Sequence, residues 1–250
     1  MKITLITVCF NSESTIQETL ESVLKQTFKN YEYLIIDGKS KDQTMRIVKE
    51  YEPKFKGKLK WISEKDEGLY DAMNKGIQLA SGDIIGILNS DDIFASCKAL
   101  ETIEKTFLKD DCDGTYSDLE IRNDAMTQVV RKFVAKTGNY KFGWYPPHPT
   151  LYLKKEVYQK HGLYNQEYSI AADYDFMLRI MKDSSVHLSY IPKTLIRMRS
   201  GGASTDGLRG YYKSFKESFH VLKKNEIRFP FIVNSIRGFK IILQSFASKK

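Results

Sequence analysis

Continuous apolar runs alternate with amphipathic segments along the first 110 residues of the chain. The apolar runs have the length and composition of buried strands and cover residues 3–8, 33–36, 59–62 and 84–88. Between them, apolar residues recur at helical spacing in 16–24, 45–51 and 69–80. Ser14 and Gln17 have the spacing of a capping box before the first helix, and Gly82 ends the third. This alternation predicts an α/β fold: a Rossmann-like, mostly parallel sheet flanked by helices.

The pattern becomes shorter and mixed after residue 110. Strand-like runs at 119–121, 128–130 and 150–153 surround a loop of Gly, Pro and aromatic residues at 143–148, and a helix is expected over 173–181. Two amphipathic segments follow, at 211–222 and 232–246. We therefore divide the chain into a first half (1–110), a second half of the same domain (111–206) and a helical tail (207–250), with Gly207 to Gly210 at the last boundary.

Polar side chains follow the predicted strands of the first half. They are Asn11, Asp37, Asp66, Asp91 and Asp92. In open α/β sheets the ligand crevice lies beyond the carboxyl ends of the strands. We expect these side chains to converge on one edge of the sheet and the second half to build the rest of the site.

Asp91 and Asp92 carry the strongest chemical signal among these residues. Vicinal carboxylates at a crevice bind Mg²⁺ or Mn²⁺ through one or two oxygens and leave the other positions to water and phosphate. The alternative is a turn and helix cap before the apolar pattern that begins at Leu100, because Asp favours both. Both interpretations stay open from these residues alone.

Asp37 closes the second strand, where a carboxylate could accept a hydrogen bond from the N–H of a uracil ring. A simple strand-end turn is the alternative. The sequence contains neither G-x-G-x-x-G nor G-x-x-x-x-G-K-[ST]. A dinucleotide-type Rossmann site and a P-loop are therefore disfavoured.

The composition is that of a globular protein. With 250 residues, 42% of them apolar, the chain can bury a full core, which excludes intrinsic disorder, collagen and a disulfide miniprotein. Its three cysteines form no C-x-x-C pair, so neither a disulfide framework nor a zinc site is indicated. The apolar run at residues 3–10 is too short for a signal peptide. We expect a cytoplasmic protein.

The net positive charge of the chain comes entirely from the tail. Residues 1–208 hold 29 basic and 29 acidic residues, whereas 209–250 hold 10 basic residues against Glu217 and Glu226. A neutral body with a basic, aromatic tail favours an anionic membrane surface and argues against nucleic acid. The alternative is that both tail helices pack on the body or on a second subunit, as in a homodimer.

Five segments of the first half resemble, in order and spacing, the motifs of glycosyltransferase family 2. They are 7–12, 36–44, 67–76, 80–83 and 88–92. The similarity extends to about residue 206 and is strongest to the small non-processive enzymes of bacterial capsule, lipopolysaccharide O-antigen and exopolysaccharide synthesis. It implies a GT-A fold, a nucleotide-sugar donor and an inverting single displacement, and we expect the donor to be a UDP-sugar.

The resemblance also assigns roles by motif position. Asp37 would contact the uracil, Asp91 and Asp92 would hold ribose, diphosphate and a Mn²⁺ or Mg²⁺ ion, and Asp92 with Asp91 would be the metal ligands. The remaining nucleotide-binding candidates are Thr7, Val8, Phe10, Asn11, Asp66, Asn74 and Ser90. A divalent cation bridging the diphosphate oxygens would stabilise the charge that develops as the anomeric C–O bond breaks.

Asp173 is the candidate catalytic base. The segment 170–179 matches the acceptor-side segment of the family, in which an aspartate opens a helix. An inverting displacement needs one carboxylate to take the proton of the attacking hydroxyl. Without the resemblance, a helix N-cap would be the preferred role for Asp173.

Two weaker candidates lie in the second half. His148 precedes a strand much as in relatives and would touch acceptor or sugar; a structural loop histidine is the alternative. Arg199 belongs to a segment, 197–205, that resembles the mobile Gly-rich loop of the family, where an arginine could grip the diphosphate. A solvated hinge is the alternative.

The chain departs from the family pattern at three positions. Asn89 stands where many relatives have a third aspartate, Gly38 replaces a common second aspartate, and Ala172 stands where glutamate often precedes the base. The number of metal ligands and the ribose contact therefore stay open. The Gln-x-x-Arg-Trp signature of processive enzymes is missing.

These observations predict a glycosyltransferase that moves one sugar to a glycan or a lipid-linked oligosaccharide at the inner face of the membrane. One alternative is a sugar-1-phosphate nucleotidyltransferase, which would need a Gly-rich, basic first loop; residues 9–13 provide neither. The other is a catalytically silent nucleotide-sugar-binding protein on the same scaffold. It would be expected to lose a carboxylate among Asp91, Asp92 and Asp173, and all three are present.

Overall fold

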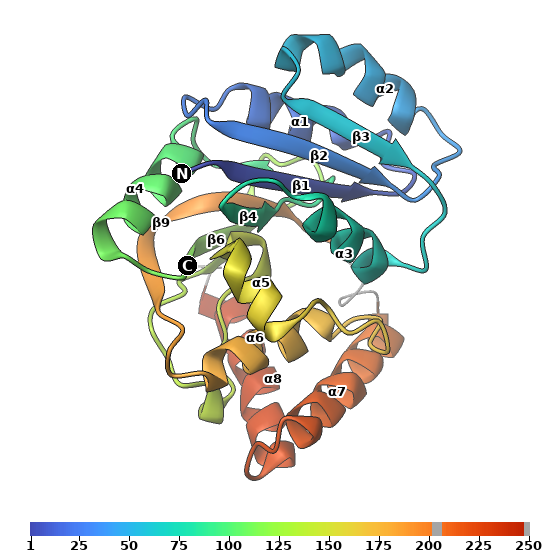
Figure 1. Ribbon diagram of the computed structural model, residues 1–250. Helices are drawn as coiled ribbons and strands as arrows, with labels where there is room; N and C mark the ends of the chain where they lie inside the picture. The colour runs from blue at the N-terminus through green and yellow to red at the C-terminus, as the bar shows by residue number, and fades with distance from the viewer. Residues whose placement is uncertain (202–206, 248–250) are drawn as a thin grey trace.

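The computed structural model describes residues 1–201 and 207–247, with side chains up to residue 201 and from 210 to 238. Nine strands of the described chain form one sheet, in the order β3-β2-β1-β4-β8-β6-β9-β5, with β7 paired to β6 (Figure 1). The strands are β1 (Ile3–Cys9), β2 (Tyr31–Asp37), β3 (Leu59–Ser63), β4 (Ile84–Ile87), β5 (Ile93–Phe94), β6 (Gly114–Arg122), β7 (Val129–Phe133), β8 (Tyr152–Lys154) and β9 (Leu188–Arg199).

The first half of the sheet is parallel and the second half is mixed. Strands β1 to β4 run parallel in the order β3-β2-β1-β4, as the alternation of strands and helices predicts. Beyond β4, β8 is antiparallel to both β4 and β6, whereas β6 and β9 are parallel. The predicted α/β fold with a helix-flanked sheet is confirmed.

Helices cover both faces of the sheet, because β1 and β2 are apolar on both sides. Ile3 and Leu5 of β1 pack in one apolar layer with α1 (Ile16–Leu24), α2 (Thr44–Tyr51) and α4 (Ala99–Asp110). Ile6 and Val8, which point to the opposite face, pack with α3 (Leu69–Leu79), α5 (Lys155–His161) and α6 (Ala172–Lys182). Short 3₁₀ turns lie at η1 (Glu52–Phe55), η2 (Tyr140–Phe142) and η3 (His148–Thr150).

Two local expectations are wrong. The capping box does not form: Thr15 is the N-cap of α1, with no side-chain cap, because the Ser12 carbonyl already accepts the N–H groups of Thr15 and Ile16. The run 150–153 is a strand only from Tyr152, since η3 precedes it. Helix α7 (Gly207–Lys224) begins at residue 207, the first residue of the expected helical tail.

The tail helices α7 and α8 (Pro230–Ala247) pack against the second half of the domain (Figure 1). Val221 and Leu222 of α7 and Val233 of α8 are buried in the same apolar layer as α6. Ile232, one of the apolar positions at helical spacing in this segment, is 57% exposed. The predicted apolar positions Phe239, Leu243 and Phe246 lie outside the described side chains, as do Lys240 and Gln244. No described helix is long and apolar enough to cross a membrane.

Candidate active site

The end of β2 is built around a buried carboxylate. Asp37 pairs in register with Cys9 of β1 and is fully buried. It accepts hydrogen bonds from the Ser40 N–H (3.1 Å) and the hydroxyls of Ser40 and Ser63 (both 2.5 Å). The Ser40 hydroxyl oxygen in turn accepts the Asn11 N–H (2.8 Å). Asp37 therefore fixes the loop against which Asn11 rests, and its contact to a base stays a prediction.

The segment at the end of β1 presents only its last residues to solvent. Thr7 is buried and donates to the Leu88 carbonyl (2.7 Å), which ties β1 to the end of β4. Val8 is buried in the core, whereas Phe10 is 60% exposed and Asn11 is exposed. Phe10 and Asn11 are thus the members of this predicted nucleotide-binding set that a ligand can reach directly.

Asp66 lies directly over Gly38. Its carboxylate accepts the Gly68 N–H (3.0 Å) and packs so close to Gly38 that a Cβ added there would collide with its Oδ2 atom. The departure from the family pattern at position 38 thus has a physical reason, because the space beside Gly38 already holds a carboxylate. Asp66 is partly exposed beside the loop that follows β2.

A tight turn after β4 carries Asp91 and Asp92. The Asn89 amide donates to Asp92 Oδ2 (3.0 Å), and the Arg199 N–H lies 3.3 Å from Asp92 Oδ1. Thr19 of α1 donates to the Asp92 carbonyl (2.9 Å), so α1 supports the turn from below. Ser90, a predicted nucleotide contact, has its hydroxyl 2.9 Å from that of Ser12.

The two carboxylates oppose each other's ionisation. Burial raises the pKa of Asp91, and burial together with the charge of Asp91 raises the pKa of Asp92 well above its ordinary value. The Asn89 Oδ1 atom beside them is buried and has no hydrogen-bond partner among the residues that the structure describes. These oxygens fit a divalent cation, which relieves the repulsion. No group of three or more His, Cys, Asp or Glu side chains among the described residues could hold a metal, so the remaining ligands would come from water or diphosphate.

Arg199 is not in a loop, as the sequence suggested, but is the last residue of β9. Its guanidinium is largely buried and pairs with Glu18 of α1 (2.8 Å) and with Asp124 (3.7 Å). The Arg199 Nε atom has no partner in the structure as described. Of the predicted Gly-rich loop, Gly202 to Thr205 lie outside the described residues.

Asp173 is held by helix α3 from the first half of the chain. The Tyr70 hydroxyl lies 3.2 Å from Asp173 Oδ1, although the two residues are 103 positions apart in the sequence. The same hydroxyl lies 2.7 Å from the Ile170 carbonyl oxygen. Burial and the Asp173 charge raise the pKa of Tyr70, so its hydroxyl stays a donor. The N-cap of α6 is Ala171, without a side-chain cap. The helix-cap alternative for Asp173 is therefore wrong.

Asn74 and His148 meet at Tyr164. The Asn74 amide donates to the Tyr164 carbonyl (2.9 Å) and accepts its N–H (3.0 Å), and the buried Asn74 thereby ties α3 to the 162–168 loop. His148 Nε2 lies 2.8 Å from Tyr164 OH. Burial lowers the pKa of His148, against the opposing effect of the Asp173 charge. His148 is thus a neighbour of Asp173, and the nucleotide contact of Asn74 stays a prediction.

Four residues outside the predicted set support this site: Ser12, Thr19, Tyr70 and Tyr164. Ser12 and Tyr70 do lie inside two of the motif segments, 7–12 and 67–76. Their partners, Ser90 and Asp173, lie on other elements, so spacing along the chain could not reveal the contacts.

Comparison with known proteins identifies the family of this chain. Residues 4–186 match the family model "Glycosyl transferase family 2". The chain belongs to glycosyltransferase family 2. An uncharacterised glycosyltransferase of Mycobacterium tuberculosis is 32% identical over 186 residues, which are 71% of this chain and 68% of that protein. The Escherichia coli UDP-Glc:alpha-D-GlcNAc-diphosphoundecaprenol beta-1,3-glucosyltransferase WfgD is 36% identical over 134 residues, 53% of this chain and 51% of that protein.

Solved structures confirm the GT-A-type fold of this family 2 chain. Staphylococcus aureus TarS superposes with a TM-score of 0.69 at 18% identity over 90% of this chain, which spans only 39% of that one. The structure of TarS residues 1–349 in complex with UDP-GlcNAc superposes with a TM-score of 0.68 at 19% identity. The match covers 89% of this chain and 67% of that one. The Pyrobaculum calidifontis mannosyltransferase PcManGT, in complex with GDP-Man and Mn²⁺, superposes with a TM-score of 0.68 at 16% identity. The match covers 94% of this chain and 69% of that one.

Proposed function

We propose that this glycosyltransferase moves a single sugar from a UDP-sugar to a glycan or lipid-linked oligosaccharide, with inversion, in bacterial surface polysaccharide synthesis. The observation that carries the proposal is the link between Tyr70 and Asp173. Tyr70 lies in the first turn of α3, directly after the loop that holds Asp66. A candidate nucleotide contact and the candidate base are therefore joined through one helix.

Two relatives support the donor and the acceptor class. WfgD is named for UDP-Glc and for an acceptor on diphosphoundecaprenol, and TarS is solved with UDP-GlcNAc. We propose that Phe10, Asn11 and Asp66 line the nucleotide, because all three are at least partly exposed where β1 to β3 end. Asp37 shapes this surface by holding the loop beneath it.

Asp91 and Asp92 are proposed to hold Mn²⁺ or Mg²⁺ together with the diphosphate. When bound, the cation would stabilise the negative charge on the leaving diphosphate. The raised pKa values of both carboxylates and the unpartnered Asn89 oxygen support this role. The Mn²⁺ in the PcManGT complex is in line with it. Arg199 lies beside Asp92 and would add positive charge if it exchanged Glu18 for phosphate.

Asp173 is proposed to act as the general base. The Tyr70 hydroxyl and the Tyr174 N–H (2.8 Å) both contact Asp173 Oδ1, and no hydrogen bond to Oδ2 is made within the described residues. Oδ2 is therefore available to take the proton of the acceptor hydroxyl. The acceptor oxygen then forms its bond to the anomeric carbon as the bond to the diphosphate breaks, and UDP leaves from the opposite face.

A nucleotide-release assay over UDP-, GDP- and dTDP-sugars, with Mn²⁺ or with a chelator, tests the reaction. Asp173→Asn is expected to keep UDP affinity by calorimetry but to lose transfer on the order of 10²-fold. Asp92→Ala is expected to abolish the gain in UDP affinity that Mn²⁺ gives. Asp110→Asn, at the end of α4, is the matched control. Near-wild-type transfer by Asp173→Asn, or equal UDP affinity with and without metal, would contradict these roles.

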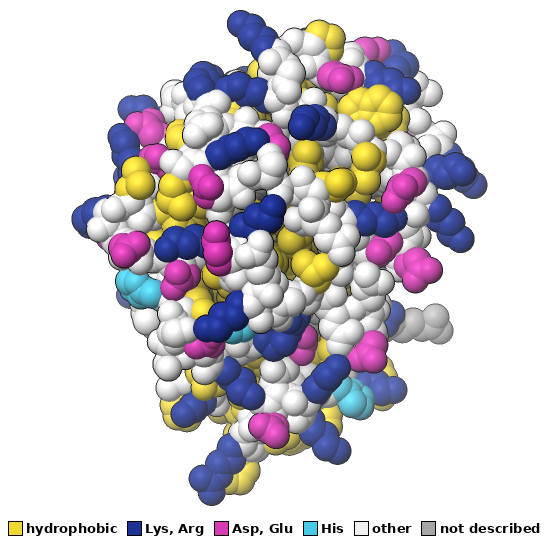
Figure 2. Space-filling model, in the orientation of Figure 1, with side chains coloured by type: hydrophobic (Ala, Val, Ile, Leu, Met, Phe, Trp, Pro, Cys, Tyr) yellow, Lys and Arg dark blue, Asp and Glu magenta, His cyan; other side chains and the backbone are white. Residues whose placement is uncertain are grey.

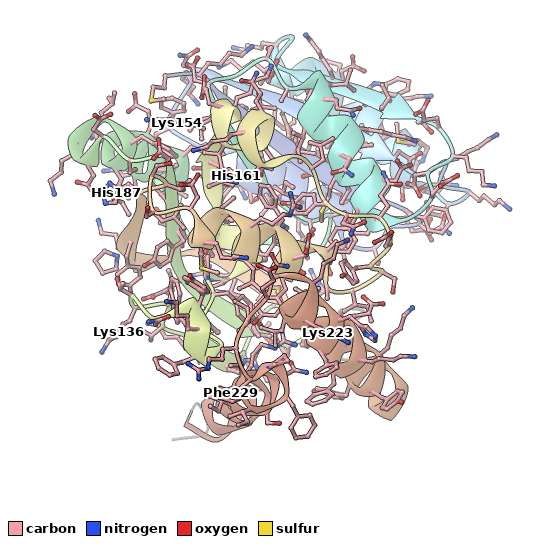
Figure 3. The ribbon with its side chains drawn as sticks, turned by 60° about the horizontal axis from the view of Figure 1, so that its bottom comes forward. Lys136, Lys154, His161, His187, Lys223 and Phe229 are labelled. Atoms are coloured by element: carbon pink, nitrogen blue, oxygen red, sulfur yellow. The ribbon has the colours of Figure 1, made fainter. Side chains whose placement is uncertain are left out.

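The tail supports a further proposal, that the enzyme is cytoplasmic and binds the inner membrane surface peripherally. Figure 2 shows Lys and Arg side chains around apolar ones at the lower end of the molecule, where Figure 1 places α7 and α8. Lys223 lies in α7, and Phe229 lies in the connection just before α8 (Figure 3). Exposed aromatic and aliphatic side chains here are Tyr211, Tyr212, Phe229, Phe231 and Ile232. Each basic residue near an anionic leaflet contributes roughly 1 kcal/mol, and apolar side chains insert at the interface.

Vesicle sedimentation tests this surface in the full-length protein. We expect binding to vesicles that contain anionic lipid, release by high salt, and loss of binding in a Tyr212→Ser/Phe231→Ser/Ile232→Ser variant. Leu108→Ser, at an exposed apolar position of α4, is the control. Truncation before α7 would remove the buried Val221 and Leu222, so point variants are the cleaner test. Equal binding to neutral vesicles, or none, would reject the membrane and favour a second copy of the chain.

A further inference from the structure

Glu217 of α7 contacts the segment that leads into the helix of the candidate base. Its Oε2 atom accepts the N–H groups of Ile170 (2.8 Å) and Ala171 (3.1 Å), and its Oε1 atom accepts the Ser169 hydroxyl (2.7 Å). Asp173 follows two residues after Ala171. One carboxylate from the C-terminal helices therefore binds three consecutive residues beside the candidate base.

This contact lies at the start of α6. Ala171 is the N-cap of the helix and makes no side-chain cap, and Glu217 accepts the N–H of this residue and of Ile170 before it. Burial raises the pKa of Glu217, but the N–H groups of Ile170 and Ala171 and the Ser169 hydroxyl outweigh it, so the pKa is lowered overall. Glu217 is therefore ionised at neutral pH and acts as a charged acceptor.

The same segment is held from the opposite side by the first half of the chain. The Ile170 carbonyl accepts the Tyr70 hydroxyl, which also contacts Asp173, while the Ile170 N–H donates to Glu217. Residue 170 is thus fixed through both of its peptide groups, by α3 on one side and by α7 on the other. Tyr70 and Glu217 together set the position of the turn from which Asp173 projects.

The packing of α7 on α6 has further contacts that do not involve Glu217. The Asn225 amide donates to Asp175 (2.9 Å), Lys182 donates to the Asn225 carbonyl (2.7 Å), and Val221 and Leu222 are buried against the core. Loss of the Glu217 carboxylate alone is therefore expected to leave α7 docked. The effect of such a change on the 169–171 segment can then be measured separately from unfolding.

We propose that Glu217 is a positioning residue: it holds segment 169–171 so that the Asp173 carboxylate faces the acceptor hydroxyl. The proposal rests on the function proposed for Asp173. It assigns a role in the reaction to α7, which lies outside the residues 4–186 that match the family model.

The test compares Glu217→Ala and Glu217→Gln with Glu226→Gln, which makes the same charge change at an exposed position after α7. We expect kcat to fall about 10-fold in Glu217→Ala, because small displacements of a catalytic group are costly in rate. Glu217→Gln keeps one acceptor oxygen and is expected to recover part of this loss. The affinity for UDP with Mn²⁺, measured by calorimetry, and the rate of Glu226→Gln are expected to match the wild type.

A double-mutant cycle separates positioning from a general loss of structure. If Glu217 acts through the base, Glu217→Ala has no further effect on kcat once Asp173→Asn is present. If the losses of kcat in the two single variants multiply in the double variant, Glu217 has a structural role and the inference is overturned. Weaker UDP binding by Glu217→Ala would overturn it too. Wild-type kcat in Glu217→Ala would overturn it as well. Failure of the wild-type enzyme to transfer any sugar would instead overturn the proposed function on which it rests.

Discussion

Glu32 is expected to make the stability of this fold depend on pH. It is the second residue of β2, at the end of the strand away from the candidate site, and it is buried. It accepts the Thr4 hydroxyl and the N–H and hydroxyl of Ser81, all at 2.6 Å, and pairs with Lys2 at 3.1 Å. Burial alone would raise its pKa, but these donors outweigh it and lower the pKa from 4.5 to about 2.

The magnitude follows from this shift. A fall in pKa of about 2.5, at about 1.4 kcal/mol for each step of one, corresponds to about 3.5 kcal/mol of folding free energy. Because the pKa is lower in the folded state, the contribution is fully present above pH 4.5 and is lost as the pH falls towards 2. Glu32→Gln keeps the size of the side chain but removes its titration.

Urea unfolding at pH 7 and at several values down to pH 2.5 measures the effect. We expect Glu32→Gln to be about 2–3 kcal/mol less stable than the wild type at pH 7 and the two proteins to converge in acid. Glu156→Gln, at an exposed position of α5, is the control and is expected to follow the wild type. UDP affinity is expected to be unchanged, since Glu32 is remote from the site. A variant that keeps the full pH dependence, or the full stability at pH 7, would refute this reasoning.

Three further substitutions test the site. Tyr70→Phe removes the hydroxyl that contacts Ile170 and Asp173; we expect a loss of about 2 kcal/mol in urea unfolding and a lower kcat, and an unaltered kcat would argue against α3 positioning the base. Asp92→Asn removes a buried charge beside Asp91 and is expected to raise the free energy of unfolding by about 1–2 kcal/mol while abolishing the effect of Mn²⁺ on UDP affinity; a destabilised variant would contradict the repulsion between the two carboxylates. Gly38→Ala is expected to displace the Asp66 carboxylate and weaken UDP binding in calorimetry; equal affinity would remove Asp66 from the nucleotide site.

The sequence alone determined the parallel half of the sheet and the family. Strands β1, β2 and β4 are short and buried along their whole length. The helices between the parallel strands each have one apolar face, so the hydrophobic pattern of each segment shows its type. Asp37, Asp66, Asp91 and Asp92 follow strand ends, and the topology of a parallel sheet brings such ends together. The motif order was then sufficient to indicate the family.

Tertiary structure decided the second half. The 12-residue strand β9, which ends at Arg199, was not predicted, because its pairing with β6 is interrupted by register shifts and its burial does not alternate. Likewise, the sequence could not indicate that Asp37 is buried, that Tyr70 reaches Asp173, or that Glu217 holds the start of α6. Periodicity reports how strongly each segment is buried, whereas these contacts join elements that are far apart in the chain. Their partners are fixed only when the sheet and helices pack.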